Sequence, residues 1–189
     1  MMMSAVTAYG LLTHGLIFGA LFALLPLGPL RHRAALGATA LALVAGIAPS
    51  MHGIFGTPSL TLLQLAILAH AGRPSPFNVR IACGLLGFSA IFYTATLGFG
   101  PFDPYAPGYQ PLPMLTMLAA LGLLLWWRGQ YAWLLILAID LAGYASGLFA
   151  NLWDALIDPL LVLLALILAG YHGIKRLRRR PQKGADPVR

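Results

Sequence analysis

An aspartate in the middle of an apolar run is the side chain of this sequence best suited to chemistry. Asp140 lies near the centre of the apolar residues 131–149, and no lysine or arginine stands at a comparable depth in another apolar run. Such a carboxylate is expected to stay protonated or to face a wet cavity, because burial disfavours its charged form. It would carry a proton or bind a cation, or else act as a neutral acid that only hydrogen-bonds a neighbouring helix.

Further polar side chains stand at helical spacing on the outer side of Asp140. Tyr144 follows it by four residues and Asn151 by eleven, so both share its face if the helix continues that far. Ser89 and Tyr93 form a second stripe of the same spacing. These stripes predict a hydrated or substrate-filled pocket with Asp140 at its floor, although polar stripes also occur where helices merely pack. The predicted binding residues are Asp140, Tyr144, Tyr93, Ser89, His14 and His52.

A proline-rich segment at residues 99–111 interrupts the apolar pattern. It reads FGPFDPYAPGYQP, and its prolines forbid a regular helix. We expect an ordered outer loop that caps the helices or serves as a lid or partner-docking surface, since long loops often carry function. Together with the acidic segment before the last apolar run, it supplies the predicted rim or lid residues, which are Asp103, Tyr105, Tyr109, Asn151, Asp154 and Asp158.

Two of these rim residues, Asp154 and Asp158, resemble a pair of carboxylates for acid and base catalysis. Local structure offers a simpler explanation of both. Asn151 followed by Asp154 resembles a helix-capping arrangement, and Asp158 directly precedes Pro159, a favourable first helical residue.

A metal ion or haem is a weaker interpretation of the polar residues. His14, His52 and Asp140 are the candidate ligands on one side of the membrane, but they come from three separate runs without any local ligand spacing. No cofactor is therefore predicted. Gln64 lies within the apolar run 58–71, and its side-chain amide is expected to hydrogen-bond a neighbouring helix.

Composition sets the environment in which these residues must work. The chain has 189 residues, of which 59% are hydrophobic and 9% charged, and its mean hydropathy is +0.81. Soluble domains carry charge on roughly a quarter of their residues. The sequence therefore predicts an all-α integral membrane protein without room for a soluble catalytic domain.

Seven apolar runs predict a seven-helix bundle formed by a single transmembrane domain, residues 1–174. The third and seventh runs are short for a span. Gly15 and Gly19, and likewise Gly143 and Gly147, have the spacing that lets two helices approach closely. The runs cover residues 9–30, 34–54, 58–71, 79–98, 112–127, 131–149 and 159–173.

The basic residues predict the orientation. With the N-terminus outside and seven crossings, every lysine and arginine falls on the cytoplasmic side, as the positive-inside rule requires. Seven of the 12 basic residues lie in the tail 175–189, which we expect to be disordered and attracted to anionic lipid head groups. Nucleic acid is not expected as a partner, because no aromatic or glycine pattern accompanies the tail.

Three hypotheses of function follow for a multi-pass protein of a cell inner membrane. The first is binding or translocation of a small solute, ion or lipid through an outward-opening cavity centred on Asp140. The second is a non-catalytic accessory subunit, assembled with itself or with a larger membrane complex. The third is a lipid-modifying enzyme that uses outer histidine and aspartate residues, although no compact catalytic motif supports it.

Overall fold

The computed structural model describes residues 4–178, and within them every regular element is a helix. The prediction of an all-α protein is confirmed. In chain order the elements are α1 (Ala5–Ala23), η1 (Gly28–Leu30), α2 (Arg31–Val44), α3 (Ile47–Phe55), α4 (Leu60–His70), α5 (Val79–Thr96), η2 (Ala106–Gly108), α6 (Leu112–Trp127), α7 (Tyr131–Ala145), α8 (Leu152–Leu156) and α9 (Pro159–Arg178).

Each predicted apolar run contains a helix, but three runs differ from the expected continuous span. In the run 9–30, α1 ends at Ala23 and only the short η1 follows within the run. The run 34–54 is broken into α2 and α3, which meet at an angle of 74°. Gly46 supplies the break, because its φ of 78° suits glycine and strains other residues. The run 131–149 stops being helical at Ala145, and Gly147 follows with a φ of 79°. Asn151 is therefore not on the helix face of Asp140.

Several of these helices are long and apolar enough to cross a membrane. Ala5–Ala23, Val79–Thr96 and the combined segment Leu152–Leu177 meet that condition, and the bent pair α2 and α3 would make a fourth span if counted as one. Helices α4, α6 and α7 are apolar but shorter. The protein is thus a helical membrane protein.

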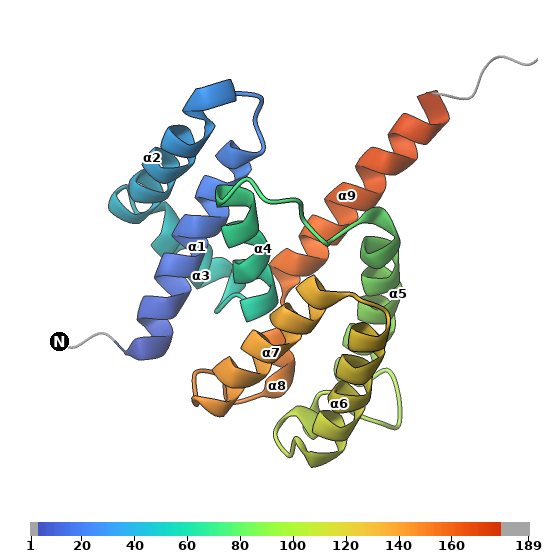
Figure 1. The fold of residues 1–189 in the computed structure, drawn as a ribbon. Coiled ribbons are helices and arrows are strands. Elements are labelled where there is room, and N and C mark those ends of the chain that lie inside the picture. The colour runs from blue at the N-terminus through green and yellow to red at the C-terminus, as the bar shows by residue number, and fades with distance from the viewer. Residues whose placement is uncertain (1–3, 179–189) are drawn as a thin grey trace, which may run out of the picture.

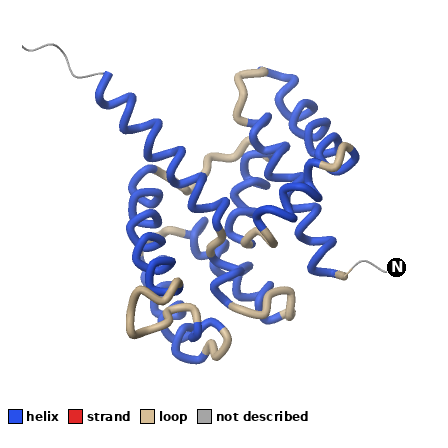
Figure 2. Tube along the Cα trace, turned by 180° about the vertical axis from the view of Figure 1, so that it is seen from behind, coloured by secondary structure: helices blue, strands red, loops and turns tan. Residues whose placement is uncertain are grey.

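The helices form two groups, and α4 lies between them (Figures 1 and 2). Helices α1, α2 and α3 pack on one another on one side, and α5 packs on α9 on the other. Helix α4 lies between them, in contact with α1, α7, α8 and α9. The largest apolar cluster includes buried side chains of α4, α5, α7 and α9, among them Leu62, Ala82, Ile136 and Leu161.

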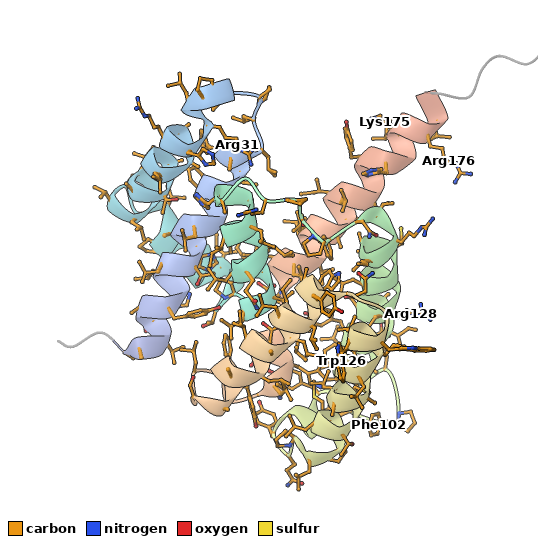
Figure 3. All side chains as sticks on the ribbon, in the orientation of Figure 1. Arg31, Phe102, Trp126, Arg128, Lys175 and Arg176 are labelled. Atoms are coloured by element: carbon orange, nitrogen blue, oxygen red, sulfur yellow. The ribbon has the colours of Figure 1, made fainter. Side chains whose placement is uncertain are left out.

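Of the four basic residues labelled in Figure 3, three lie at one end of the molecule and the fourth, Arg128, lies between the two ends. Arg31, Lys175 and Arg176 lie at one end, whereas Phe102 of the proline-rich loop lies at the opposite end (Figure 3). Residues 179–189 of the predicted basic tail lie outside the described residues.

Helices α1 and α2 approach closely because α1 carries glycines at their contact. A Cβ atom at Gly15 would lie 3.0 Å from Leu43 Cγ, and one at Gly19 would meet the Thr39 hydroxyl and lie 2.6 Å from the Ala35 carbonyl oxygen. The expected close approach at these two glycines is confirmed. Gly147, by contrast, has no neighbour that a Cβ atom would meet.

Helix α4 is held at its C-terminal end by side chains of the first group. Arg31 Nη2 donates to the Ala69 carbonyl oxygen at 3.0 Å, and His32 Nδ1 donates to that of His70 at 2.8 Å. The His70 ring in turn donates to the Leu16 carbonyl oxygen at 3.0 Å. The His70 carbonyl group lies at the helix end, where carbonyl groups lack a partner within the helix, and the Arg31 cation there suits the helix dipole.

We predict that Gly19→Ala destabilises the protein. The added methyl group would press on the Ala35 backbone, which cannot move aside as a flexible side chain would, and such overpacking costs about 1–3 kcal/mol. Thermal unfolding of the purified protein in detergent measures the effect. Gly37→Ala is the matched control, because the space around Gly37 in α2 is open and alanine favours helix. Equal melting temperatures for the two variants would contradict the proposed close contact.

Candidate functional site

Asp140 is the centre of a hydrogen-bonded contact between α4 and α7. Its side chain is 1% exposed. Thr61 Oγ1 donates to Oδ2 at 2.7 Å, and Gln64 Nε2 donates to Oδ1 at 2.8 Å. Gln64 also donates to the Ile136 carbonyl oxygen at 3.2 Å. Both carboxyl oxygens therefore have a neutral donor, and the predicted bond of Gln64 to a neighbouring helix is confirmed.

Thr61 was not among the predicted site residues. Thr61 and Gln64 are three residues apart on α4, so they share the face that α7 covers. That spacing was a signal available in the sequence, although nothing in it indicated that Asp140 would be the acceptor.

Asp140 also lines a cavity of about 240 Å³ whose other walls are mainly apolar. Residues of α5, α6, α7 and α9 surround it, including Phe88, Leu118, Ile136 and Leu161. Tyr144, one turn along α7, packs instead beside Leu60 and Phe149.

The two predicted histidines come together at the end of α3. His14 Nε2 and His52 Nδ1 donate to the same oxygen, the Gly56 carbonyl, at 2.9 and 3.0 Å. Their ring centroids are 5.7 Å apart. Asp140 is not part of this pair, and within residues 4–178 no three histidine, cysteine, aspartate or glutamate side chains gather as metal ligands would.

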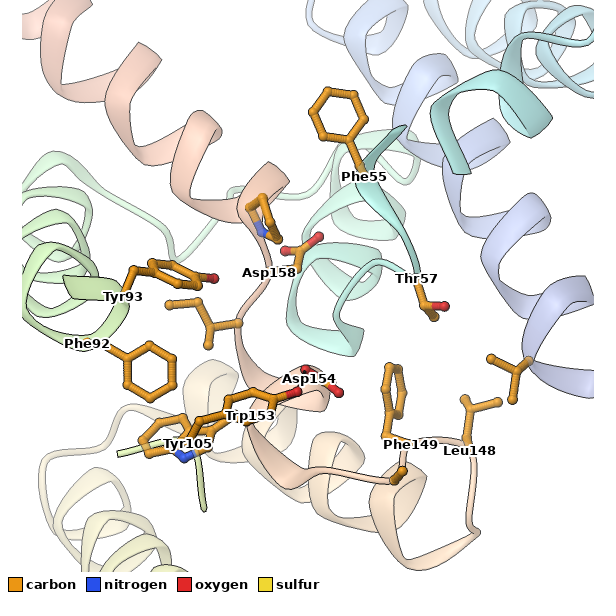
Figure 4. A pocket seen from close by; sticks show the side chains of 14 residues that line it. Phe55, Thr57, Phe92, Tyr93, Tyr105, Leu148, Phe149, Trp153, Asp154 and Asp158 are labelled. Atoms are coloured by element: carbon orange, nitrogen blue, oxygen red, sulfur yellow. Dashed lines mark hydrogen bonds between the residues drawn. The ribbon is translucent and has the colours of Figure 1, made fainter. Parts of the chain in front are cut away.

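A second, larger cavity of about 410 Å³ opens among the ends of five helices (Figure 4). Its lining includes residues near the start of α1 and near the end of α5, and these helix ends lie toward the end of the molecule that carries the proline-rich loop (Figure 1). The hydroxyl of Tyr93 points toward Asp158. The polar side chains that line this cavity are Thr57, Tyr93, Tyr105, Asp154 and Asp158, and the aromatic ones are Phe55, Phe92, Phe149 and Trp153.

This second cavity is called the outer cavity below, because it lies toward the end of the molecule that carries the proline-rich loop. Asp158 is placed at its wall by its role as a helix cap. Its Oδ1 atom accepts the Leu161 backbone N–H at 3.0 Å, in the first turn of α9, and the Ser59 hydroxyl at 3.0 Å. Ser59 Oγ itself accepts the Leu62 N–H and caps α4. The capping role predicted for Asp158 is confirmed, and the residue is 4% exposed.

The proline-rich loop is bound to α8 beside the same cavity. Tyr105 Oη donates to Asp154 Oδ1 at 2.7 Å, Trp153 Nε1 donates to the Pro104 carbonyl oxygen at 2.9 Å, and Asn151 Nδ2 donates to that of Tyr105 at 3.2 Å. Burial and the bond to Asp154 raise the pKa of Tyr105 above its ordinary value, so the phenol keeps the proton that it donates.

Asn151 performs two tasks at this junction. Besides holding the loop, its Oδ1 atom accepts the Trp153 N–H at 2.9 Å and caps α8, as the capping pattern predicted. Gly108 lies so close to Asn151 that a Cβ atom would overlap its side-chain amide. The absence of a side chain at Gly108 therefore allows the loop to dock.

The remaining predicted residues lie outside the outer cavity. Asp103 accepts the Tyr105 N–H at 2.9 Å within the loop, and both Asp103 and Tyr109 line a separate, somewhat more open hollow of about 880 Å³ formed by the loop and the start of α6. Ser89 is buried in α5, and its Oγ atom has no hydrogen-bond partner among the described residues. Of the two-residue stripe on α5, only Tyr93 reaches the cavity.

The fold and this site define a class, a helical membrane protein with a cavity walled by carboxylates and aromatic rings. Comparison with protein-family models, with curated proteins and with solved structures finds no match to the chain. Function has to be inferred from the residues of the chain itself.

We predict that Gln64→Leu destabilises the protein by about 1–3 kcal/mol, because it leaves a buried oxygen of Asp140 without its donor. Gln110→Leu, in the exposed part of the loop, is the control for the same change in side chain. Replacing both partners, as Gln64→Leu with Asp140→Leu, should recover part of the loss, since an apolar pair leaves no orphaned carboxyl group. Chemical unfolding in detergent measures all three, and a Gln64→Leu variant as stable as Gln110→Leu would contradict the contact.

Proposed function

We propose that this protein binds a small solute in the outer cavity and acts as a receptor or carrier for it in the membrane. The observation that carries the proposal is the cavity itself, where Asp154, Asp158 and Tyr93 meet a wall of aromatic rings. Its volume of about 410 Å³ falls in the range of small-ligand sites, roughly 300–1,000 Å³. A few convergent polar groups among apolar walls are also typical of such sites.

The centre of this proposed site differs from the sequence-based hypothesis, which used Asp140. Asp140 has donors on both oxygens and lies in the separate, mainly apolar cavity. Asp158 takes its place as the acid of the outer cavity, and Asp140 holds α4 against α7. The two acids are connected through α4, because Ser59 at the start of that helix bonds Asp158 while Thr61 bonds Asp140.

We further propose seven crossings of a cell inner membrane, with the outer cavity on the non-cytoplasmic face. The basic end of the molecule in Figure 3 supports the cytoplasmic placement of Arg31 and Lys175. Helix α4, with 11 residues, is about 16 Å long, which is short for the roughly 30 Å hydrocarbon core. Protein groups hydrogen-bond to both of its ends, Ser59 at one and Arg31 at the other, which lowers the cost of placing these ends inside the bilayer.

Cysteine labelling on either side of α4 tests the seven crossings. In a Cys83→Ser background, Phe55→Cys should react with a membrane-impermeant maleimide added to intact cells, and Arg73→Cys only after permeabilisation. Asp103→Cys serves as the outer reference and Arg128→Cys as the inner one. Labelling of Phe55→Cys and Arg73→Cys from the same side would show that α4 does not cross.

Native mass spectrometry of the protein purified in mild detergent tests the proposed function. We expect a retained small molecule, and we expect Asp158→Asn to reduce its occupancy at least tenfold. Asparagine remains a good helix cap, so this variant should fold. Asp103→Asn, a carboxylate change outside the outer cavity, is the matched control and should keep full occupancy.

Other spectra would contradict the proposal. A stoichiometric partner protein without any small ligand would favour the accessory-subunit hypothesis. A metal ion or haem lost in His14→Ala would favour chemistry at the histidine pair. Equal occupancy in Asp158→Asn and Asp103→Asn would show that the molecule is bound elsewhere.

A further inference from the structure

We infer that the ligand of the outer cavity is a small organic cation, an amine or a quaternary ammonium compound. This inference rests on the proposed function and adds the chemical class of the ligand.

The charge of the lining residues is the first argument. Asp154 and Asp158 both line the cavity, and within the described part of the chain none of its lining residues is a lysine, an arginine or a histidine. Both recorded bonds to Asp158 end on Oδ1, and the bond from Tyr105 ends on Asp154 Oδ1. Both carboxylates keep acceptor capacity, because a carboxylate has about four lone-pair sites and these bonds use one or two of them. An anionic ligand would meet two acids and no base.

The aromatic wall is the second argument, and it is independent of the first. Trp153 and Phe92 lie with ring centroids 4.8 Å apart, Phe92 and Tyr93 lie 5.4 Å apart, and Phe92 and Tyr105 lie 6.3 Å apart. Phe92 thus contacts the other three rings, and all four rings line the cavity. Aromatic faces attract cations, and sites for quaternary ammonium groups use several of them together.

The dimensions of the cavity favour an organic cation over a bare metal ion. A metal ion needs several oxygen or nitrogen ligands in one shell, whereas no group of three metal-binding side chains occurs in the described part of the chain. About 410 Å³ is also far more space than a single ion fills. A substituted ammonium ion would use the volume, place its charge beside the carboxylates and lay its alkyl groups on the rings.

Two probes of nearly equal shape test the inference. Choline carries a trimethylammonium group, and 3,3-dimethylbutan-1-ol has an uncharged carbon in place of the nitrogen. Isothermal titration of the full-length protein in detergent should show choline binding at least tenfold more tightly than the alcohol. Asp158→Asn should weaken choline binding and leave the alcohol unchanged, whereas Asp103→Asn should alter neither.

The outcomes separate this inference from the proposed function. Equal binding of both probes would overturn the inference that the ligand is a cation. It would leave the proposed binding of a small solute in place. Failure of choline to bind would also overturn it, and the native spectra would then show whether the cavity holds an uncharged molecule. A co-purified molecule identified as an amine or quaternary ammonium compound supports the inference directly.

Discussion

The polar face of α4 is the constraint on which the rest of the structure depends. Apolar side chains are as well solvated by lipid as by one another, so the hydrophobic effect does little to hold helices together inside a bilayer. Short helices then need specific contacts. Helix α4 makes such contacts toward α9 through Ser59 and toward α7 through Thr61 and Gln64. At its other end, carbonyl groups of α4 accept hydrogen bonds from Arg31 and His32.

This arrangement explains why two acids can be buried without a basic partner among residues 4–178. Asp140 and Asp158 each accept two hydrogen bonds from neutral donors, which removes much of the cost of burying a carboxyl group. With α4 fixed against α7 and against the start of α9, the α8 segment is left at the edge of the outer cavity, where the proline-rich loop can dock on it.

The helices could largely be predicted from the sequence, whereas their joints could not. The run of apolar residues is a local property, and α6, predicted at residues 112–127, has those limits in the structure. The bend at Gly46 and the early end of α7 are different, because glycine permits a positive φ without requiring it. Whether such a residue breaks a helix depends on what the two halves contact, here the His14 and His52 rings at the Gly56 carbonyl group.

The site was harder to predict because it, too, depends on contacts between segments that are distant in the sequence. The prediction grouped Asp140 with Tyr93 and His14 because all were expected in the outer half of the membrane, but depth does not determine which helix faces which. In the structure α7 ends at Ala145 and is followed by α8. Asp154 and Asp158, which were predicted at the rim, therefore line the wall of the outer cavity. The carboxylates that best fit ligand binding are therefore those first explained as helix caps. Capping and binding are compatible, because a cap uses one oxygen of the carboxyl group and leaves the other for a ligand.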